Sequence, residues 1–329
     1  MAEHPKKHHF VPQFLLRRFA GPDEKLLIHR VAEDKQYQAT VVNTGHRNLG
    51  HSLYRPGREP DHHSMEGWMS DLESEASAAV RELAQGRTRH VPADVRRALA
   101  WLMALQWQRS RFLLHVVGQE VTARADAWAA ADPFAVDLGE DDATNDPAQE
   151  ALLLQTALMS ILDRHVLEPW RLRDEQDASP KDRWNHLVSI VLGSNMHWSC
   201  YRPTWGGLVT SDTTVCFSGI TGTPPADIPV GFFDHGVGAG LHQFKRITMP
   251  LGSNLAVIIS QDPRDADRLS AADINRFTVY NSREFVAHSS ALPQSNPKLA
   301  TALKEALAVQ RMIAPAFLHG YGPGARRTP

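Results

Sequence analysis

The chain has 329 residues, which is enough for one large domain or two ordinary ones with a full hydrophobic core. Hydrophobic residues make up 42% and charged residues 22% of the sequence, so general disorder, a collagen, a coiled coil and a bundle of membrane helices are excluded. The formal net charge of −2 gives no signal for a polyanionic partner, although it leaves nucleic acid open.

The cysteine content and the N-terminal sequence favour a cytoplasmic protein without a membrane contact. Two cysteines, Cys200 and Cys216, are too few for a disulfide framework or a four-thiolate zinc site, and they are typical of a reducing compartment. The first residues, MAEHPKKHHF, lack the apolar run of a signal peptide, and no apolar stretch long enough for a membrane helix follows.

The first half of the chain is predicted to be mainly helical. Pro12 suits the first turn of a helix and Gly21 its end, which predicts a short helix over 12–20 with His8 and His9 on extended backbone before it. Strand-like sequences follow at residues 26–31 and 37–42. Longer helices are predicted over 64–86, from Ala93 toward Ala131 with a break near Gly118, and over 150–167, ending before Pro169.

The second half is richer in short strands. Residues 132–148 are predicted to form an acidic surface loop and 171–183 a solvated connection. Strands are predicted at 197–202, 207–209, 213–217 and 255–259, and helices at 271–284 and 297–313. This order predicts an α+β fold, in which a helical first half packs on a small mixed or antiparallel sheet built mainly from the second half. We expect segments 1–170, 171–184 and 185–329 to form one composite domain.

Histidine is abundant, with 17 copies concentrated early in the chain. The pairs His8-His9 and His62-His63 enclose His46 and His51. Histidine is the commonest metal ligand and titrates near neutral pH, so a metal site is one explanation. The other explanation for the many histidines is a coding bias toward GC-rich codons.

Two carboxylates lie on the apolar face of the predicted helix 64–86. The apolar stripe comprises Met65, Met69, Leu72, Ala76, Val80 and Leu83. Glu73 falls within that stripe, and Glu66 shares its face two turns earlier. Because burying an unpaired carboxylate costs several kcal/mol, Glu73 is expected to have a partner.

The next predicted helix carries Gln106 and Arg109 on its apolar face. A buried guanidinium needs a carboxylate, a phosphate or several carbonyls to satisfy its five donors. Arg109 and Glu73 therefore either pair across the helix interface as a structural ion pair, or converge on a polar cavity that also receives the segment with His8 and His9.

A third polar group lies between two predicted strands. Ser211 and Asp212 follow Val209 and Thr210, at a place where a strand ends. Such positions often present a carboxylate to a cavity, but an ordinary Asx or Ser/Thr turn is the alternative.

Five segments together resemble one bacterial family, the domain of unknown function 4238. They are HHFVPQFLLRRF at 8–19, QWQRSRF at 106–112, MHWSCYR at 196–202, VTSDTTV at 209–215, and Pro250-Leu251. The resemblance covers about residues 7–290, and relatives commonly carry HHYVPQFYLRNF at the first segment. Relatives often have Asn-Pro after the Asp, where this chain has Thr213-Thr214. The resemblance implies a family but no assigned chemistry.

The leading functional hypothesis is a divalent-metal-dependent hydrolase of phosphodiester or phosphoanhydride bonds. In this hypothesis, His9 and Asp212 bind the metal, with Glu73 as a third ligand or general base. Mixed histidine and carboxylate ligation suits Zn, Mn or Fe. Arg109 neutralises charge on the substrate. Supporting catalytic and substrate-binding roles fall to His8, Gln13, Gln106 and Ser211.

Two other classes of function remain open. In the first, Arg109, Gln106 and the His8-His9 segment form a non-catalytic pocket for a small anionic ligand. In the second, the chain is a toxin or defence effector that binds a partner protein. A nucleotide cofactor is not indicated, because neither Gly-rich phosphate loop is present. An HNH nuclease is disfavoured, because His46 and His51 lack the compact ββα frame.

Overall fold

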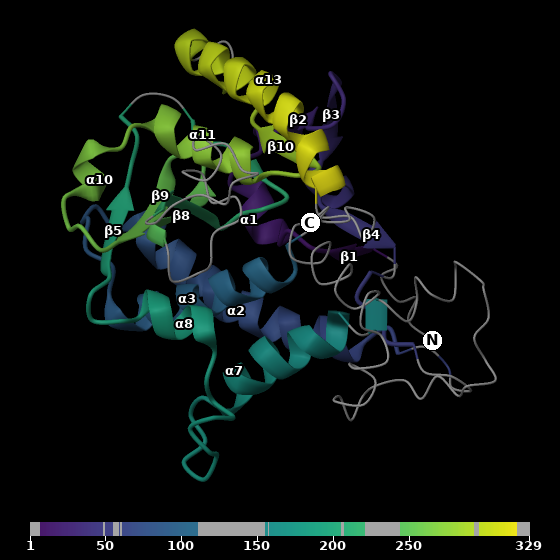
Figure 1. Cartoon of the computed structure of the whole chain (residues 1–329), viewed down its shortest axis with the longest axis vertical. Helices are drawn as coiled ribbons and strands as arrows, with labels where there is room; N and C mark the ends of the chain where they lie inside the picture. Colours follow the sequence, from purple (N-terminus) through teal and green to yellow (C-terminus); the bar gives the residue numbers. More distant parts are fainter. Residues whose placement is uncertain are drawn as a thin grey trace, which may run out of the picture.

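The computed structural model describes residues 7–48, 50–54, 59, 61–110, 155–156, 158–204, 207–220, 244–292 and 296–320. Helices dominate the described part of residues 64–191, and antiparallel sheets combine strands from residues 7–48 with strands from residues 197–288, so the fold class is α+β, as the sequence predicts (Figure 1). None of the helices in these ranges combines the length and hydropathy needed to cross a membrane.

Two helices form the centre of the helical layer. Helix α2 (Ser64–Gln85) packs along helix α3 (Ala93–Gln108), and the predicted apolar stripe of α2 is buried between them. The short helix α8 (His186–Val191) packs on α3. The predicted continuation of α3 toward Ala131, the break near Gly118 and the loop at 132–148 all lie outside the described residues.

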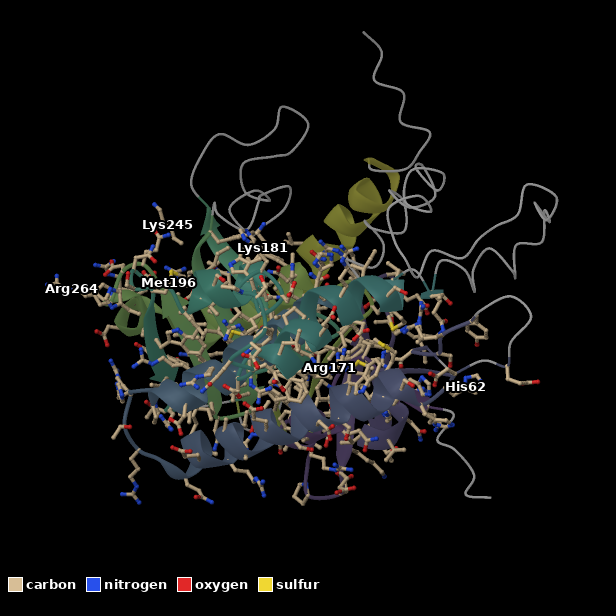
Figure 2. The ribbon with its side chains drawn as sticks, turned by 90° about the horizontal axis from the view of Figure 1, so that it is seen from below. His62, Arg171, Lys181, Met196, Lys245 and Arg264 are labelled. Atoms are coloured by element: carbon tan, nitrogen blue, oxygen red, sulfur yellow. The ribbon has the colours of Figure 1, made fainter. Side chains whose placement is uncertain are left out.

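The next helix continues past the proline that was expected to end it. A π-helical segment, η2 (Asp163–Leu167), leads directly into α7 (Glu168–Leu172), which contains Pro169. Pro169 has no N–H to donate to the carbonyl of His165. Instead the side-chain Nδ2 of Asn185 donates to that carbonyl at 2.6 Å, which compensates for the missing helical bond. Arg171, labelled in Figure 2, covers the ring of Trp68 at 4.1 Å.

The described strands form three sheets, all with antiparallel pairing. The two-stranded sheet pairs β1 (Lys7–His9) with β4 (His46–Asn48). The second sheet has the order β3 (Gln36–Thr40), β2 (Lys25–Arg30), β10 (Phe285–His288) and β6 (Thr210–Ser211). The third has the order β5 (His197–Tyr201), β9 (Leu255–Ser260), β8 (Phe244–Gly252) and β7 (Cys216–Ile220).

Some strand positions differ from the sequence predictions. The strands predicted at 207–209 and 213–217 are replaced by β6 and β7, because residues 212–214 form the turn between them. Strand β8 is absent from the predictions. It contains Pro250, which is unusual inside a sheet, and its pairing with β9 becomes irregular between Pro250 and Gly252.

The remaining elements connect and cover the sheets. They are α1 (Gln13–Arg17), η1 (Val41–Asn43), α10 (Asp265–Arg268), α11 (Ala271–Asn281) and α13 (Pro297–Gly320). Helix α11 begins at a capping box formed by Ser270 and Asp273, and α13 packs along it. The largest apolar core joins α2, α3 and α8 to β5, β8 and β9, so the two halves of the chain share one core.

Candidate metal centre

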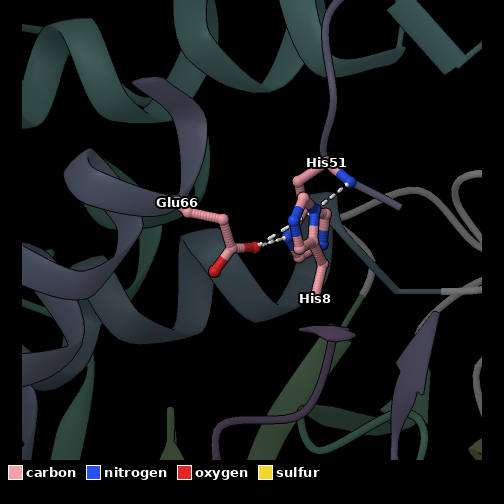
Figure 3. Close-up of side chains that lie close together, drawn as sticks. All are labelled: His8, His51 and Glu66. Atoms are coloured by element: carbon pink, nitrogen blue, oxygen red, sulfur yellow. Dashed lines mark hydrogen bonds and ion pairs between the residues drawn. The ribbon is translucent and has the colours of Figure 1, made fainter. Parts of the chain in front are cut away.

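Three side chains from separate segments converge beside α2. His8 comes from β1, His51 follows β4, and Glu66 lies in the first turn of α2. One potential ligand atom of each residue lies within 4.8 Å of the others. Figure 3 shows the three side chains pointing toward one another. His8 and His51 are 1% and 5% exposed, whereas the Glu66 side chain is 34% exposed. The group is therefore buried on the histidine side and open on the carboxylate side.

Local structure determines where these three residues lie. The pairing of β1 with β4 places His8 opposite Arg47, four residues before His51. Asp61 accepts hydrogen bonds from the backbone N–H groups of His63 and Ser64, at 2.9 and 3.0 Å, where α2 begins. These bonds satisfy donors that have no helical partner, and they fix the start of the helix that carries Glu66.

Hydrogen bonds link the three side chains. The backbone N–H of His51 donates to Nδ1 of His8 at 2.9 Å, so a neutral His8 carries its ring proton on Nε2. The Nδ1 atom of His51 bonds to Oε1 of Glu66, which is also 3.7 Å from Nδ1 of His8. Burial by itself raises the pKa of Glu66, but the bond to His51 and the charges of His51, His8 and Arg109 outweigh it. The net effect lowers the pKa, so Glu66 is a carboxylate at neutral pH.

This set of donors is one that proteins use for divalent metals. Two imidazole nitrogens and one carboxylate occur in zinc hydrolases and in non-haem iron sites. Three protein ligands also leave positions for water or a substrate. The three residues can hold a metal ion when it takes the place of the present hydrogen bonds at Nδ1 of His8 and of His51, and the negative charge of Glu66 favours it.

Glu73 and Arg109 form an ion pair next to this group. Nη2 of Arg109 lies 2.5 Å from Oε1 of Glu73, and the Arg109 side chain is 1% exposed while that of Glu73 is 22% exposed. Burial raises the pKa of Glu73, and the opposing charge and hydrogen bond of Arg109 offset this only in part. The charge of Arg109 also reaches Glu66 and His9. The pair thus joins α2 to the end of α3 and contributes to the electrostatics of the three-residue group.

His9 and Gln13 lie in a separate hydrogen-bonded chain. Nε2 of Gln13 bonds to Nδ1 of His9 at 3.3 Å, and Oε1 of Gln13 accepts from Arg17 at 2.9 Å. Nε2 of His9 bonds to the carbonyl of Val42 at 3.2 Å. Burial lowers the pKa of His9, which favours the neutral ring. Both ring nitrogens of His9 are therefore occupied, and His9 is not one of the three converging residues.

Ser211 and Asp212 lie in the turn after β6. The carboxylate of Asp212 accepts hydrogen bonds from the backbone N–H groups of Arg283, at 3.0 and 3.1 Å, and Phe285, at 3.2 Å. Burial outweighs these bonds and raises the pKa of Asp212 to about 6. Ser211 donates to the carbonyl of Thr213 at 2.8 Å. Asp212 thus holds the turn to the start of β10, the Ser211 side chain bonds within the turn, and neither residue belongs to the group with His8.

Gln106 is buried on α3, where its Oε1 accepts a hydrogen bond from Thr214 at 3.3 Å. This contact links the end of α3 to the turn after β6. Of the eight residues predicted from sequence, the structure places His8 in the converging group and the Glu73–Arg109 pair within electrostatic range of it. Among the described residues, His9 and Asp212 do not form a common metal-binding group.

The sequence interpretation did not include His51 and Glu66 among the candidate site residues, although they belong to the converging group. Two signals pointed toward them: His51 belongs to the early run of histidines, and Glu66 shares a helical face with Glu73. Neither signal reveals that the backbone after β4 brings His51 to His8, because that contact depends on pairing between segments about 40 residues apart.

One family model, described as protein of unknown function (DUF4238), matches residues 7–291. Neither the curated proteins nor the solved structures give a match. The matched range contains all three converging residues and the Glu73–Arg109 pair. Because the match covers most of the sequence, the chain belongs to the DUF4238 family of proteins of unknown function.

Proposed function

We propose that the protein is a divalent-metal-dependent hydrolase that cleaves phosphodiester or phosphoanhydride bonds. The observation that carries this proposal is the convergence of His8, His51 and Glu66. This ligand set differs from the one expected from the sequence: His51 and Glu66 take the places of His9 and Asp212, and His8, expected in a supporting catalytic role, becomes a ligand. Zinc, manganese or iron would suit the mixed histidine and carboxylate donors.

A divalent ion held there would lower the pKa of a water molecule and polarise a phosphoryl oxygen. The chain's own residues prepare the site for this chemistry. The bond from the His51 backbone holds the His8 ring beside His51 and Glu66, where an ion bound at Nδ1 would take the place of this bond. The lowered pKa of Glu66 keeps a negative charge at the ligand position, and a charge already in place reduces the reorganisation needed during reaction.

Glu73 is the proposed general base. Its pKa is raised by burial while that of Glu66 is lowered, and two carboxylates in contrasting environments are typical of acid–base sites. Its carboxylate is partly exposed and is held in place by Arg109. Arg109 is buried in this pair, so we assign it a positioning role instead of the direct contact with substrate expected from the sequence.

A turnover assay tests the proposal. The metal-free full chain would be incubated with zinc, manganese or iron(II), and with bis-p-nitrophenyl phosphate or a nucleoside triphosphate as substrates. We expect metal-dependent hydrolysis that falls at least about a hundredfold in Glu66→Gln. The matched control is Glu82→Gln, which changes an exposed carboxylate on the same helix. Metal binding without turnover of either substrate would contradict the hydrolase and favour the non-catalytic pocket for a small anion.

A further inference from the structure

We propose that Arg47 is the residue that binds the phosphoryl group of the substrate at this centre. The inference rests on the proposed function and adds a substrate contact to it. Two observations place Arg47 beside the segments that carry the ligand histidines.

The first observation is the register of the two-stranded sheet. His8 pairs directly with Arg47, Lys7 pairs with Asn48, and His9 pairs with His46. Directly opposed residues of an antiparallel pair lie on the same face, with Cβ atoms about 4.5–5.5 Å apart. Arg47 therefore leaves the sheet on the face that carries the ligand His8, and Lys7 leaves on the other face.

The second observation is the close approach of Arg47 to Gly50, the residue immediately before His51. A Cβ atom added to Gly50 would lie 2.8 Å from Cβ of Arg47 and within 4 Å of its Cγ and Cδ. The stem of Arg47 thus packs against Gly50, where any larger residue would force one of the two segments to shift. Arg47 is in this way flanked by the backbone of both histidine ligands.

The exposure and the positive charge of Arg47 suit it to bind an anion that arrives from solvent. Arg47 is exposed, whereas Arg109 is buried against Glu73. An anionic substrate arriving from solvent can therefore reach the side chain of Arg47, whereas reaching Arg109 would require breaking its buried pair with Glu73. Arginine binds phosphoryl oxygens through two parallel N–H donors, so it fits a phosphoryl group that also contacts the metal.

The test uses the full chain loaded with cobalt(II), whose visible absorption changes when an anion joins its ligands. Inorganic phosphate is the probe, and it is titrated into wild type, Arg47→Gln, Arg47→Lys and Lys7→Gln. Lys7→Gln is the matched control, because it removes an exposed positive charge from the opposite face of the same two-stranded sheet. Cobalt content and thermal unfolding are measured for each variant.

We expect Arg47→Gln to bind phosphate about tenfold more weakly or worse, with full cobalt content and an unchanged unfolding temperature. Arg47→Lys should lose less, and Lys7→Gln should remain within about twofold of wild type. Equal weakening in Arg47→Gln and Lys7→Gln would overturn the inference, since it would show a general charge effect. Unchanged binding in Arg47→Gln would overturn it too.

The same titration separates this inference from the function on which it rests. If wild type takes up cobalt but Arg47→Gln takes up less, Arg47 supports the ligands and the inference is wrong while the metal site stands. If wild type takes up cobalt but no phosphate, the inference fails in the same way. If wild type takes up no cobalt at one ion per chain, the metal-dependent function fails, and the role of Arg47 fails with it.

Discussion

Glu66 and Glu73 lie two turns apart on one face of α2, yet their pKa values move in opposite directions. Burial acts to raise both. At Glu66 the bond and charge of His51, together with the charges of His8 and Arg109, reverse the effect. At Glu73 the charge of Arg109 reduces it without reversing it. One helix face thus carries a carboxylate suited to bind a cation and another suited to accept a proton.

The Glu73–Arg109 pair gives a first prediction about stability. Replacing Arg109 with Met should cost about 3 kcal/mol of unfolding free energy, because it leaves the mostly buried carboxylate of Glu73 without its cation. Replacing both residues, as Glu73→Leu with Arg109→Met, should recover much of that loss. Urea unfolding of the two single variants and the double variant measures the coupling. Additive losses would show that the two side chains do not stabilise each other.

Asp212 gives a second prediction, which separates structure from metal binding. Asp212→Ala should cost about 2–4 kcal/mol, because the backbone N–H groups of Arg283 and Phe285 lose their acceptor inside the protein. Urea unfolding measures the loss. Metal content of the folded fraction should stay at the wild-type level. Loss of metal with little change in stability would contradict the structural role and support Asp212 as a ligand.

A third prediction concerns a pair of buried histidines that join β2 to β10. Nε2 of His29 lies 2.9 Å from Nε2 of His288, whose Nδ1 donates to the carbonyl of Ser289 at 2.7 Å. Nε2 of His288 is therefore the acceptor when both rings are neutral. Burial, followed by the charges of His288, Arg311 and Lys304, lowers the pKa of His29 to about 4.

This lowered pKa makes the pair sensitive to acid. Between pH 6.5 and 4 the unfolded chain protonates His29 but the folded chain does not, so the stability contributed by the neutral ring is present above pH 6.5 and is lost as the pH falls. The contribution is about 3 kcal/mol across that window. His29→Gln should flatten the decline in unfolding free energy between pH 7 and pH 4.5 relative to wild type. Parallel pH profiles for the two proteins would show that His29 does not titrate in this way.

The sequence predicts much of the helical layer because helical periodicity is local. The apolar stripe of α2, with Glu66 and Glu73 on its face, follows from spacing alone, and Arg109 is correctly expected on the buried side of α3. Strands β2, β3 and β9 are also predicted within one or two residues, since their composition is strand-like and turn residues surround them.

The candidate site is harder to predict because non-local contacts assemble it. His51 follows a short strand of unremarkable sequence, and only the pairing of β4 with β1 brings it to His8. The continuation through Pro169 has a similar origin, since the compensating donor is Asn185, sixteen residues later. Helical periodicity and strand propensity do not reveal which residues distant in the sequence will meet. The residue types present, mainly histidines and carboxylates, still limit the kinds of reaction that a site built from them can perform.

Metal content tests the central claim most directly. Untagged wild type, His51→Ala and Glu66→Gln would be compared with His9→Gln by inductively coupled plasma mass spectrometry on folded protein. The account predicts close to one divalent ion per chain in wild type and in His9→Gln, and loss of that ion in His51→Ala and Glu66→Gln. Metal that survives both changes, or that disappears only in His9→Gln, would contradict a centre built from His8, His51 and Glu66.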